Sequence, residues 1–179
     1  VHRSSALSSR WLSANRRLFC GNRDKFANLT TPDPEQLYML LAEMAADNVE
    51  YVFIEATSHA LWLDKLSALW FDAAIFTNLT PEHLDFHGSM ENYLRSKQKL
   101  FRQSALAVIN ADSEYYNDIA EACVGRVVSC SATGVGAGCD YTATEITDNG
   151  TEGMSYILRS ERAVFRLKTQ IPGKFSVIN

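Results

Sequence analysis

The side chains most suited to chemistry lie within residues 76–101, which read FTNLTPEHLDFHGSMENYLRSKQKLF. Two histidines, His83 and His87, follow an apolar run that ends at Thr77, and imidazoles commonly bind metals or transfer protons. Ser89 then fits the N-cap of a helix, because apolar residues recur after it at helical spacing and its hydroxyl can accept from a free backbone amide. The segment therefore predicts a polar loop that leads into an amphipathic helix.

Lys97 lies on the apolar side of that predicted helix. At about 100° per residue, the same face carries four apolar or aromatic residues, namely Tyr93, Leu94, Leu100 and Phe101. An unpaired cation facing inward is costly, so something must compensate it. Two hypotheses stay open. The stem can cover Tyr93 and Phe101 while the ammonium reaches the edge, or the amine has a chemical role, either neutral or after covalent conversion to an anion.

Glu55 and His83 can converge at one edge of a sheet. Glu55 lies at the end of the apolar run 51–56, and His83 follows the run 72–77; both runs read as buried strands. The carboxyl ends of parallel strands meet at the same edge. One carboxylate and one imidazole suit a Mg²⁺ ion that keeps waters and takes its other ligands from phosphate. A solvent-facing Glu55 and a His83 that bonds only to backbone are the alternatives.

Zinc is a weaker hypothesis for this loop. The HxxxH spacing of His83 and His87 would place both rings on one face of a helix, as some zinc sites require. Pro81 before them and Gly88 after them leave little room for a helix, which disfavours this site. Zinc-ligand spacing is also missing among the four cysteines, which we expect to be free thiols: Cys20, Cys123, Cys130 and Cys139.

Four hydroxyl side chains lie next to predicted strand ends or helix starts: Thr30, Thr31, Thr57 and Ser58. Capping of the helices is their default role. The alternative is that they hold anionic groups of a substrate, because helix N-termini attract negative charge. His59, which follows them, fits a packing or capping role better than a catalytic one.

Helix and strand patterns alternate along the chain, which predicts an α/β fold with an open, mostly parallel sheet and flanking helices. The expected helices begin at Pro34, at 58–66, after Ser89 and at 114–123, and the expected buried strands are 51–56, 72–77, 105–109 and 126–130. Apolar and polar residues then alternate over 140–146, 154–159 and 163–168, which indicates a small antiparallel β appendage. Another helix is expected to start near Phe175.

Composition limits the classes of function. The chain has 179 residues and 46% hydrophobic content, enough for one domain's core, and no apolar run approaches the ~20 residues that span a bilayer. Six basic residues and one acid give residues 1–25 a charge of +5, which leaves −9 for the rest of a chain with net charge −4. These features disfavour nucleic-acid binding and membrane insertion, and they favour a cytoplasmic location.

Residues 1–25 differ in composition from the rest of the chain. They are rich in Arg and Ser and contain Asp24 as their one acid. Such a segment is typical of a disordered basic arm, a targeting peptide or a stretch that is not native to the domain. We therefore expect an ordered domain over residues 26–179 alone.

Five motifs occur in the order and spacing of the central ATPase domain of the Mur ligases, which the chain resembles over residues 26–179: LTTPDPEQL, EATSHAL, FTNLTPEHLDFHGSMENYLRSKQKLF, VINAD and PGKFSVIN. The resemblance implies an incomplete copy of that domain's fold. It also implies a part in an ATP-dependent amide ligase that adds a third amino acid, diaminopimelate or lysine, to UDP-N-acetylmuramoyl-L-alanyl-D-glutamate during peptidoglycan synthesis. An acyl phosphate is the implied intermediate, and a monomer is expected.

The resemblance also implies roles for individual residues. Lys97 matches a lysine that carbon dioxide converts to a carbamate, which explains a cation on the apolar face. This lysine and His83 would be catalytic. The implied Mg²⁺ ligands are Glu55, His83 and Lys97, the implied contacts with the muramoyl dipeptide are Thr30, Thr31, Thr57, Ser58 and Lys65, and Asn179 matches an asparagine near the adenine of ATP.

Several departures from the family pattern bear on activity. The chain contains no GxxxxGK[ST] phosphate loop, which the family places before LTTPDP. Thr57, Lys65 and Ser176 stand where serine, arginine and asparagine are usual. We expect the uridine-binding N-terminal domain and the C-terminal domain to be absent and the chain to be inactive alone. A non-catalytic Mur-like binding module is the alternative, and a folylpolyglutamate ligase is a weaker one.

Overall fold

The computed structural model describes residues 9–12, 17–20, 23–26, 31–134 and 138–178. The chain divides into two compact units, Val1–Ala68 and Leu69–Asn179. Each unit is described by itself. Among the described residues, no helix is both long and apolar enough to span a membrane.

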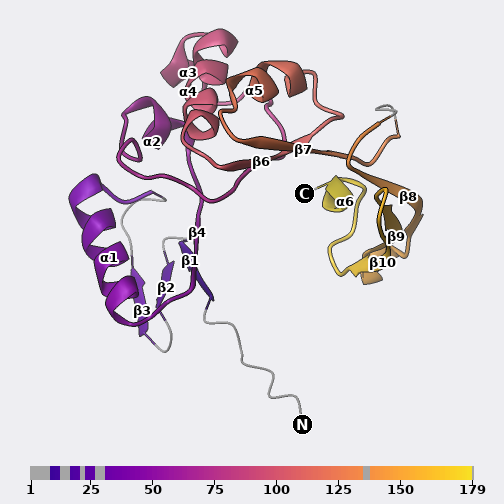
Figure 1. Cartoon of the computed structure of the whole chain (residues 1–179), viewed down its shortest axis with the longest axis horizontal. Coiled ribbons are helices and arrows are strands. Elements are labelled where there is room, and N and C mark those ends of the chain that lie inside the picture. Colours follow the sequence, from indigo (N-terminus) through magenta and orange to yellow (C-terminus); the bar gives the residue numbers. More distant parts are fainter. Residues whose placement is uncertain (1–8, 13–16, 21–22, 27–30, 135–137, 179) are drawn as a thin grey trace. The chain divides into compact units, whose positions relative to one another are not determined.

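The first unit contains a four-stranded sheet with the order β3-β2-β1-β4 (Figure 1). Strand β1 pairs antiparallel with β2 and parallel with β4, and β2 pairs antiparallel with β3. The strands are β1 (Ser9–Leu12), β2 (Arg17–Cys20), β3 (Arg23–Phe26) and β4 (Tyr51–Ile54). Strands β1, β2 and most of β3 lie within the basic segment 1–25, whose expected disorder or non-native origin stays a prediction.

Helix α1 (Pro34–Ala46) follows the predicted pattern. Pro34 occupies its first turn, where a missing amide hydrogen costs nothing, and Leu37, Leu40 and Met44 are buried at helical spacing. Asp33 stands at the N-cap, but its side chain makes no capping bond there. Its carboxylate instead accepts a 2.6 Å hydrogen bond from Lys65 Nζ. The helix therefore begins at Pro34, as the sequence predicts.

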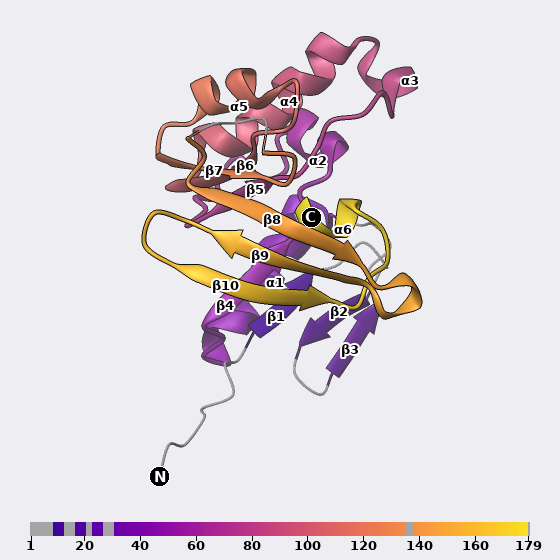
Figure 2. The same cartoon turned by 90° about the vertical axis from the view of Figure 1, so that its right-hand side faces the viewer.

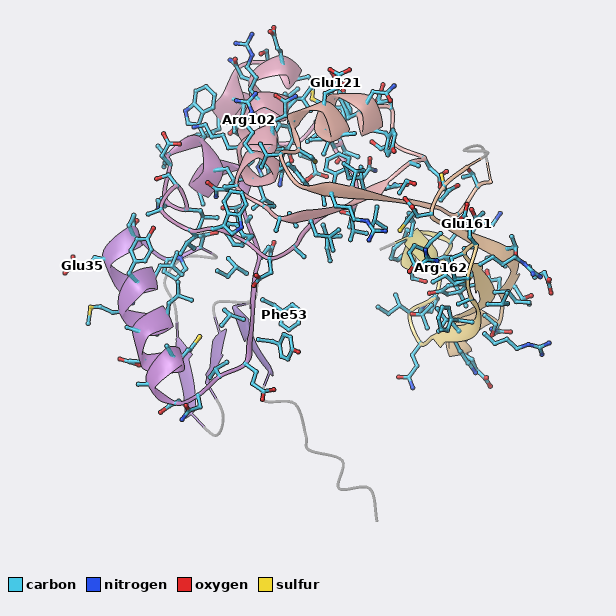
Figure 3. The ribbon with its side chains drawn as sticks, in the orientation of Figure 1. Glu35, Phe53, Arg102, Glu121, Glu161 and Arg162 are labelled. Carbon is cyan, nitrogen blue, oxygen red and sulfur yellow. The ribbon has the colours of Figure 1, made fainter. Side chains whose placement is uncertain are left out.

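Strand β4 departs from the prediction that both of its faces are covered. Tyr51 is 51% exposed and Phe53, which is labelled on this strand in Figure 3, is 42% exposed. Among the described strands, β4 is the last of its sheet and pairs with β1, so it is an edge strand and not the central strand that its apolar run predicts. Helix α2 (Ser58–Trp62) is also four residues shorter than expected. It ends early because Asp64 takes a left-handed conformation with φ 55°.

The second unit contains a six-stranded sheet with the order β10-β9-β8-β7-β6-β5. Strands β5 to β8 run parallel, while β9 and β10 are antiparallel (Figure 2), so the expected fold class is confirmed. The strands are β5 (Ala74–Phe76), β6 (Leu106–Asn110), β7 (Arg126–Ser131), β8 (Tyr141–Asp148), β9 (Met154–Arg159) and β10 (Val164–Thr169). The antiparallel strands extend the parallel sheet, because Cys130 on β7 pairs with Tyr141 on β8.

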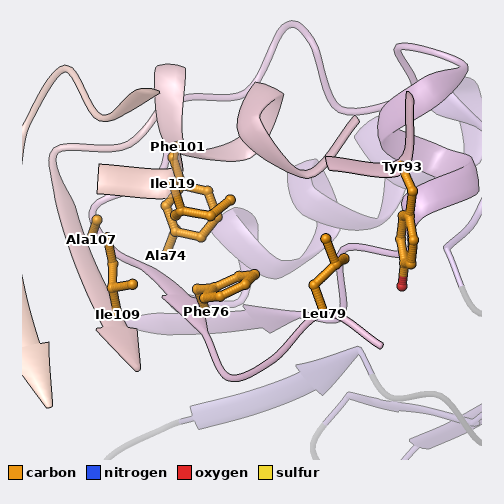
Figure 4. Packing of buried hydrophobic residues seen from close by; sticks show 8 residues of the cluster. All are labelled: Ala74, Phe76, Leu79, Tyr93, Phe101, Ala107, Ile109 and Ile119. Atoms are coloured by element: carbon orange, nitrogen blue, oxygen red, sulfur yellow. The ribbon is translucent and has the colours of Figure 1, made fainter. Parts of the chain in front are cut away.

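Helices α4 and α5 lie on the same side of β6 and β7 (Figure 1). A buried cluster fills the space between them and the sheet, and in Figure 4 Tyr93 lies at one end of it, beyond Leu79. Within it the rings of Phe76 and Phe101 meet edge to face, with centroids 6.1 Å apart. The helices of this unit are α3 (Leu84–His87), α4 (Met90–Arg102), α5 (Tyr116–Ala122), the 3-10 turn η1 (Gly150–Glu152) and α6 (Phe175–Ile178).

Side chains also lock the loops at the carboxyl ends of β6 and β7. The Asp112 carboxylate accepts hydrogen bonds from Ser131 Oγ at 2.6 Å, Thr133 Oγ1 at 2.6 Å and the Ala132 amide at 2.7 Å. Burial alone would raise the pKa of this carboxyl, but the hydrogen bonds from Ser131, Thr133 and Ala132 outweigh it and hold the pKa below its ordinary value. The charged carboxylate therefore stabilises the folded loop.

Substitution Asp112→Asn tests this lock. We expect it to lower the free energy of unfolding at pH 7 by about 1–3 kcal/mol, because the amide keeps one acceptor oxygen and places a donor against backbone amides. The lowered folded-state pKa makes the wild-type advantage complete above the ordinary aspartate value of about 3.9, and the advantage declines as the pH falls through the folded-state pKa. Urea unfolding between pH 3 and 7 measures it. The exposed Asp72→Asn is the matched control, and equal losses in both variants would contradict the account.

Candidate active site

Helix α4 is joined firmly to the histidine loop that precedes it. Ser89 Oγ accepts a 3.2 Å hydrogen bond from the Asn92 amide, as expected of an N-cap, and Asn92 Nδ2 donates to the carbonyl of His87 at 2.9 Å. Gly88 permits the turn between them through a positive φ of 74°. The start of α4 and the end of α3 therefore hold each other in place.

Lys97 lies where the helical pattern predicts it, on the face of α4 that carries the buried Tyr93 and Phe101. The side chain is half-buried, and its Nζ lies over the Tyr93 ring, 5.9 Å from the centroid. The charged end of Lys97 thus lies over an aromatic ring, and the hypothesis that its stem covers Tyr93 and Phe101 stays a prediction. The carbamate hypothesis stays a prediction.

The two histidines of the loop differ in exposure, but both contact Tyr93. His87 is 3% exposed and stacks on the Tyr93 ring, with centroids 4.9 Å apart and planes 9° apart. His83 is exposed, has φ 57°, and meets the same ring edge to face at 6.5 Å. Helix α3 fills the little room between Pro81 and Gly88 with a single turn that follows His83 and ends at His87.

Tyr93 is the residue that these contacts share. Its side chain is 7% exposed. Burial raises the pKa of its phenol, and the nearby Glu82 carboxylate raises the pKa further, so the phenol stays neutral at physiological pH. A neutral, electron-rich ring thus lies among Lys97, His83 and His87. The sequence pattern marks Tyr93 only as a core residue, because its spacing of four from Lys97 is also that of ordinary helical neighbours.

In the first unit, three predicted substrate residues lie together at the start of α2. Thr31 Oγ1 donates to the Glu55 carbonyl at 3.1 Å and lies 3.1 Å from Thr57 Oγ1. Thr57 Oγ1 also accepts a 3.3 Å bond from the Ala60 amide, so it caps α2 as the default hypothesis states. Ser58 is 3% exposed in the same turn. Thr30 and Asn179, two other predicted contacts, lie outside the described residues.

Lys65, the remaining predicted substrate contact, forms an ion pair with Asp33 at the start of α1. The Lys65 side chain is 17% exposed, so the pair is partly shielded from water. This ion pair could not be predicted from the hydrophobic pattern, because its two residues are 32 positions apart in the sequence. It forms because the start of α1 and the turn after α2 lie next to each other in the fold.

The predicted metal ligands belong to different units: Glu55 to the first, His83 and Lys97 to the second. Glu55 and His83 are both exposed, as ligands that take further partners from a substrate must be. Among the described residues, no cluster of three or more His, Cys, Asp or Glu side chains forms a complete metal cage. An exposed carboxylate and imidazole with open positions suit Mg²⁺, which usually keeps waters and binds phosphate. The chemistry of these two side chains suits that ion, and their assembly into one site stays a prediction.

A protein-family model described as the Mur ligase middle domain matches residues 10–179. The chain belongs to the Mur ligase family. The match to its middle domain begins well before residue 26, where the motifs alone placed the start, and so includes most of the segment once expected to be non-native.

Named relatives of this middle domain are UDP-N-acetylmuramoyl-L-alanyl-D-glutamate--2,6-diaminopimelate ligases. The Clostridium botulinum enzyme is 34% identical over 163 residues, which are 90% of this chain and 32% of that protein. The Streptomyces coelicolor enzyme is 37% identical over 152 residues, 84% of this chain and 30% of that protein. This Mur ligase chain thus spans about a third of the length of the relatives it matches.

A solved structure of an enzyme with the same name has the same fold as this Mur ligase middle domain. It superimposes with a TM-score of 0.77 over 94% of the chain and 35% of its own length, at 24% identity. A MurF ligase from Thermotoga maritima in complex with ADP matches with a TM-score of 0.51 over 66% of this chain and 28% of its own, at 16% identity.

Substitution Thr57→Ala tests the cap of α2. We expect it to lower the free energy of unfolding by ~1 kcal/mol, because the Ala60 amide loses its side-chain acceptor and Thr31 loses a partner. Thr57→Ser is the matched control, since it retains the oxygen and should retain most of the stability. Guanidinium unfolding of the three proteins measures the difference. If alanine and serine have the same effect, the hydroxyl does not cap the helix.

Proposed function

We propose that this chain is the middle-domain part of an ATP-dependent acid–amino-acid ligase that extends UDP-N-acetylmuramoyl-L-alanyl-D-glutamate by one amino acid. The observation that carries the proposal is 34–37% identity to diaminopimelate-adding ligases over 84–90% of the chain. The names of these relatives favour diaminopimelate over lysine as the amino acid added. Because the chain spans about a third of their length, the activity belongs to a longer protein.

The proposed reaction makes an amide bond through an acyl phosphate. The free carboxylate of D-glutamate takes the γ-phosphoryl group of ATP, and the amine of the incoming amino acid then displaces phosphate. The family membership and the ADP named in the MurF structure support ATP as the nucleotide, and Asn179 is the proposed contact to its adenine.

The proposed Mg²⁺ ligands are the Glu55 carboxylate, the His83 imidazole and a carbamate on Lys97. The carbamate forms when the neutral Lys97 amine adds to carbon dioxide and releases a proton, so that a cation becomes an anion. When bound, the ion offsets charge on the phosphates. The exposure of Glu55 and His83 supports this assignment, since both can reach a substrate phosphate.

The hydroxyls at the start of α2 are proposed to hold the muramoyl dipeptide. Thr31, Thr57 and Ser58 lie together there, and Thr30 and Lys65 complete the proposed set. A cation and several hydroxyls suit the carboxylates of the dipeptide, whose free D-glutamate carboxylate must be fixed near the γ-phosphate. We further propose that the protein acts as a monomer in the cytoplasm, where its nucleotide substrates occur.

A non-catalytic binding module is the second candidate. The observation that favours it is the lack of a GxxxxGK[ST] motif within these 179 residues. Such a module would keep the hydroxyls for the muramoyl dipeptide and would bind it without ATP. The two candidates differ in whether nucleotide is consumed, so one assay separates them.

Expression of the complete reading frame that encodes this chain tests the proposal. We expect ATP-dependent formation of the muramoyl tripeptide, detected by mass spectrometry. Lys97→Met should lower kcat by about 100-fold or more, because it removes a preorganised charge at the phosphoryl group. Lys99→Met, two residues along the same helix, is the control and should stay within about two-fold of wild type. Binding of the dipeptide without any turnover would favour the module, and equal losses in both variants would contradict the role of Lys97.

A further inference from the structure

We propose that Tyr93 is a positioning residue for the candidate site. Its ring sets the direction of the Lys97 side chain and, through His87, the position of the loop that carries His83. The expected effect of Tyr93 on catalysis rests on the proposed function. The contacts that support its positioning role all lie within the second unit.

Three separate contacts converge on this one ring. The Lys97 Nζ lies over it at 5.9 Å from the centroid, His87 stacks on it at 4.9 Å, and His83 meets it edge to face at 6.5 Å. All three distances are within the range of cation–π and aromatic contacts. Lys97 lies on α4, and His83 and His87 lie in the segment before it. Tyr93 therefore contacts both segments and holds them in fixed positions relative to each other.

The ring itself has little freedom to move. It is 7% exposed and belongs to the buried cluster with Leu79, Phe76 and Phe101, at the end shown in Figure 4. The Ser89 cap and the bond from Asn92 to the His87 carbonyl fix the backbone before it, and Ser96 Oγ donates to the Tyr93 carbonyl at 2.6 Å. A rigid ring is a suitable surface for a flexible lysine, whose four-carbon stem otherwise samples many rotamers.

Two properties of the side chain are separable. The aromatic ring makes the three contacts, and they do not require the phenolic oxygen. Substitution Tyr93→Phe therefore retains the proposed function of the ring, and Tyr93→Leu removes the face while it keeps an apolar side chain in the cluster. Phe101→Leu is the matched control, because Phe101 lies in the same helix and cluster, is 1% exposed, and meets Phe76 edge to face.

The first arm of the test measures geometry in the 179-residue chain. Lysines are converted to ¹³C-dimethyl-lysines, which keep their charge, and the Lys97 signal is assigned by its loss in Lys97→Arg. We expect an upfield, ring-shifted methyl signal that persists in Tyr93→Phe and Phe101→Leu and moves to the position of an ordinary lysine in Tyr93→Leu. An unchanged Lys97 signal in Tyr93→Leu, with the fold intact by circular dichroism, would overturn the proposal.

The second arm measures ligation in the protein from the complete reading frame. We expect Tyr93→Leu to lower kcat by about 10- to 100-fold with KM for ATP within about two-fold, since a small displacement of a catalytic group affects the chemical step most. Tyr93→Phe should recover most of the rate. Equal kcat losses in Tyr93→Leu and Phe101→Leu would mean that Tyr93 contributes only packing in the core, and would overturn the proposal. If the wild-type protein does not ligate, the proposed function fails, and the first arm still decides the role of the ring.

Discussion

The contact between the Lys97 side chain and the Tyr93 ring is the interaction on which the arrangement of the candidate site depends. A lysine on the apolar face of a helix must either reach water or find a partner, and here the ring provides a surface 5.9 Å from the charge. The packing of α4 makes this possible, because Phe101 is buried one turn further along and Gln98 donates to the Asp118 carbonyl on α5 at 2.9 Å. Helix α4 cannot rotate without breaking these contacts, so the direction of Lys97 follows from the core.

The remainder of the second unit supplies a rigid frame at the carboxyl ends of its parallel strands. Asn110 Nδ2 donates to the Thr77 carbonyl at 2.8 Å, which joins the ends of β6 and β5, and the Asp112 carboxylate locks the loop that follows β7. The side chains of Asn110 and Asp112 therefore form hydrogen bonds that hold the loops in place. In the same unit, the side chain of His83 is exposed. In open α/β sheets, ligands bind at the carboxyl ends of the strands, where some polar side chains hold the loops and others bind the ligand.

The sequence predicted best those features that depend on local periodicity. Helices α1 and α4 were recovered because each buries a continuous stripe and begins at a recognisable cap position. The sequence predicted less well those features that depend on which strands lie next to one another. Strand β4 is as apolar as a central strand but lies at an edge, and β8 alternates like an independent hairpin strand yet pairs in parallel with β7. The stacking of His87 on Tyr93 could not be read from residue types either, because it depends on a one-turn helix between two left-handed residues, His83 and Gly88.

The most direct test of the central claim is a crystal structure of the protein from the complete reading frame, with Mn²⁺ in place of Mg²⁺ and a non-hydrolysable ATP analogue. The account predicts one anomalous peak near the γ-phosphate, bound by the Glu55 carboxylate and the His83 imidazole, with a carboxylate group attached to Lys97 Nζ beside it. An unmodified Lys97 amine, together with a metal that binds without Glu55 and His83, would contradict it.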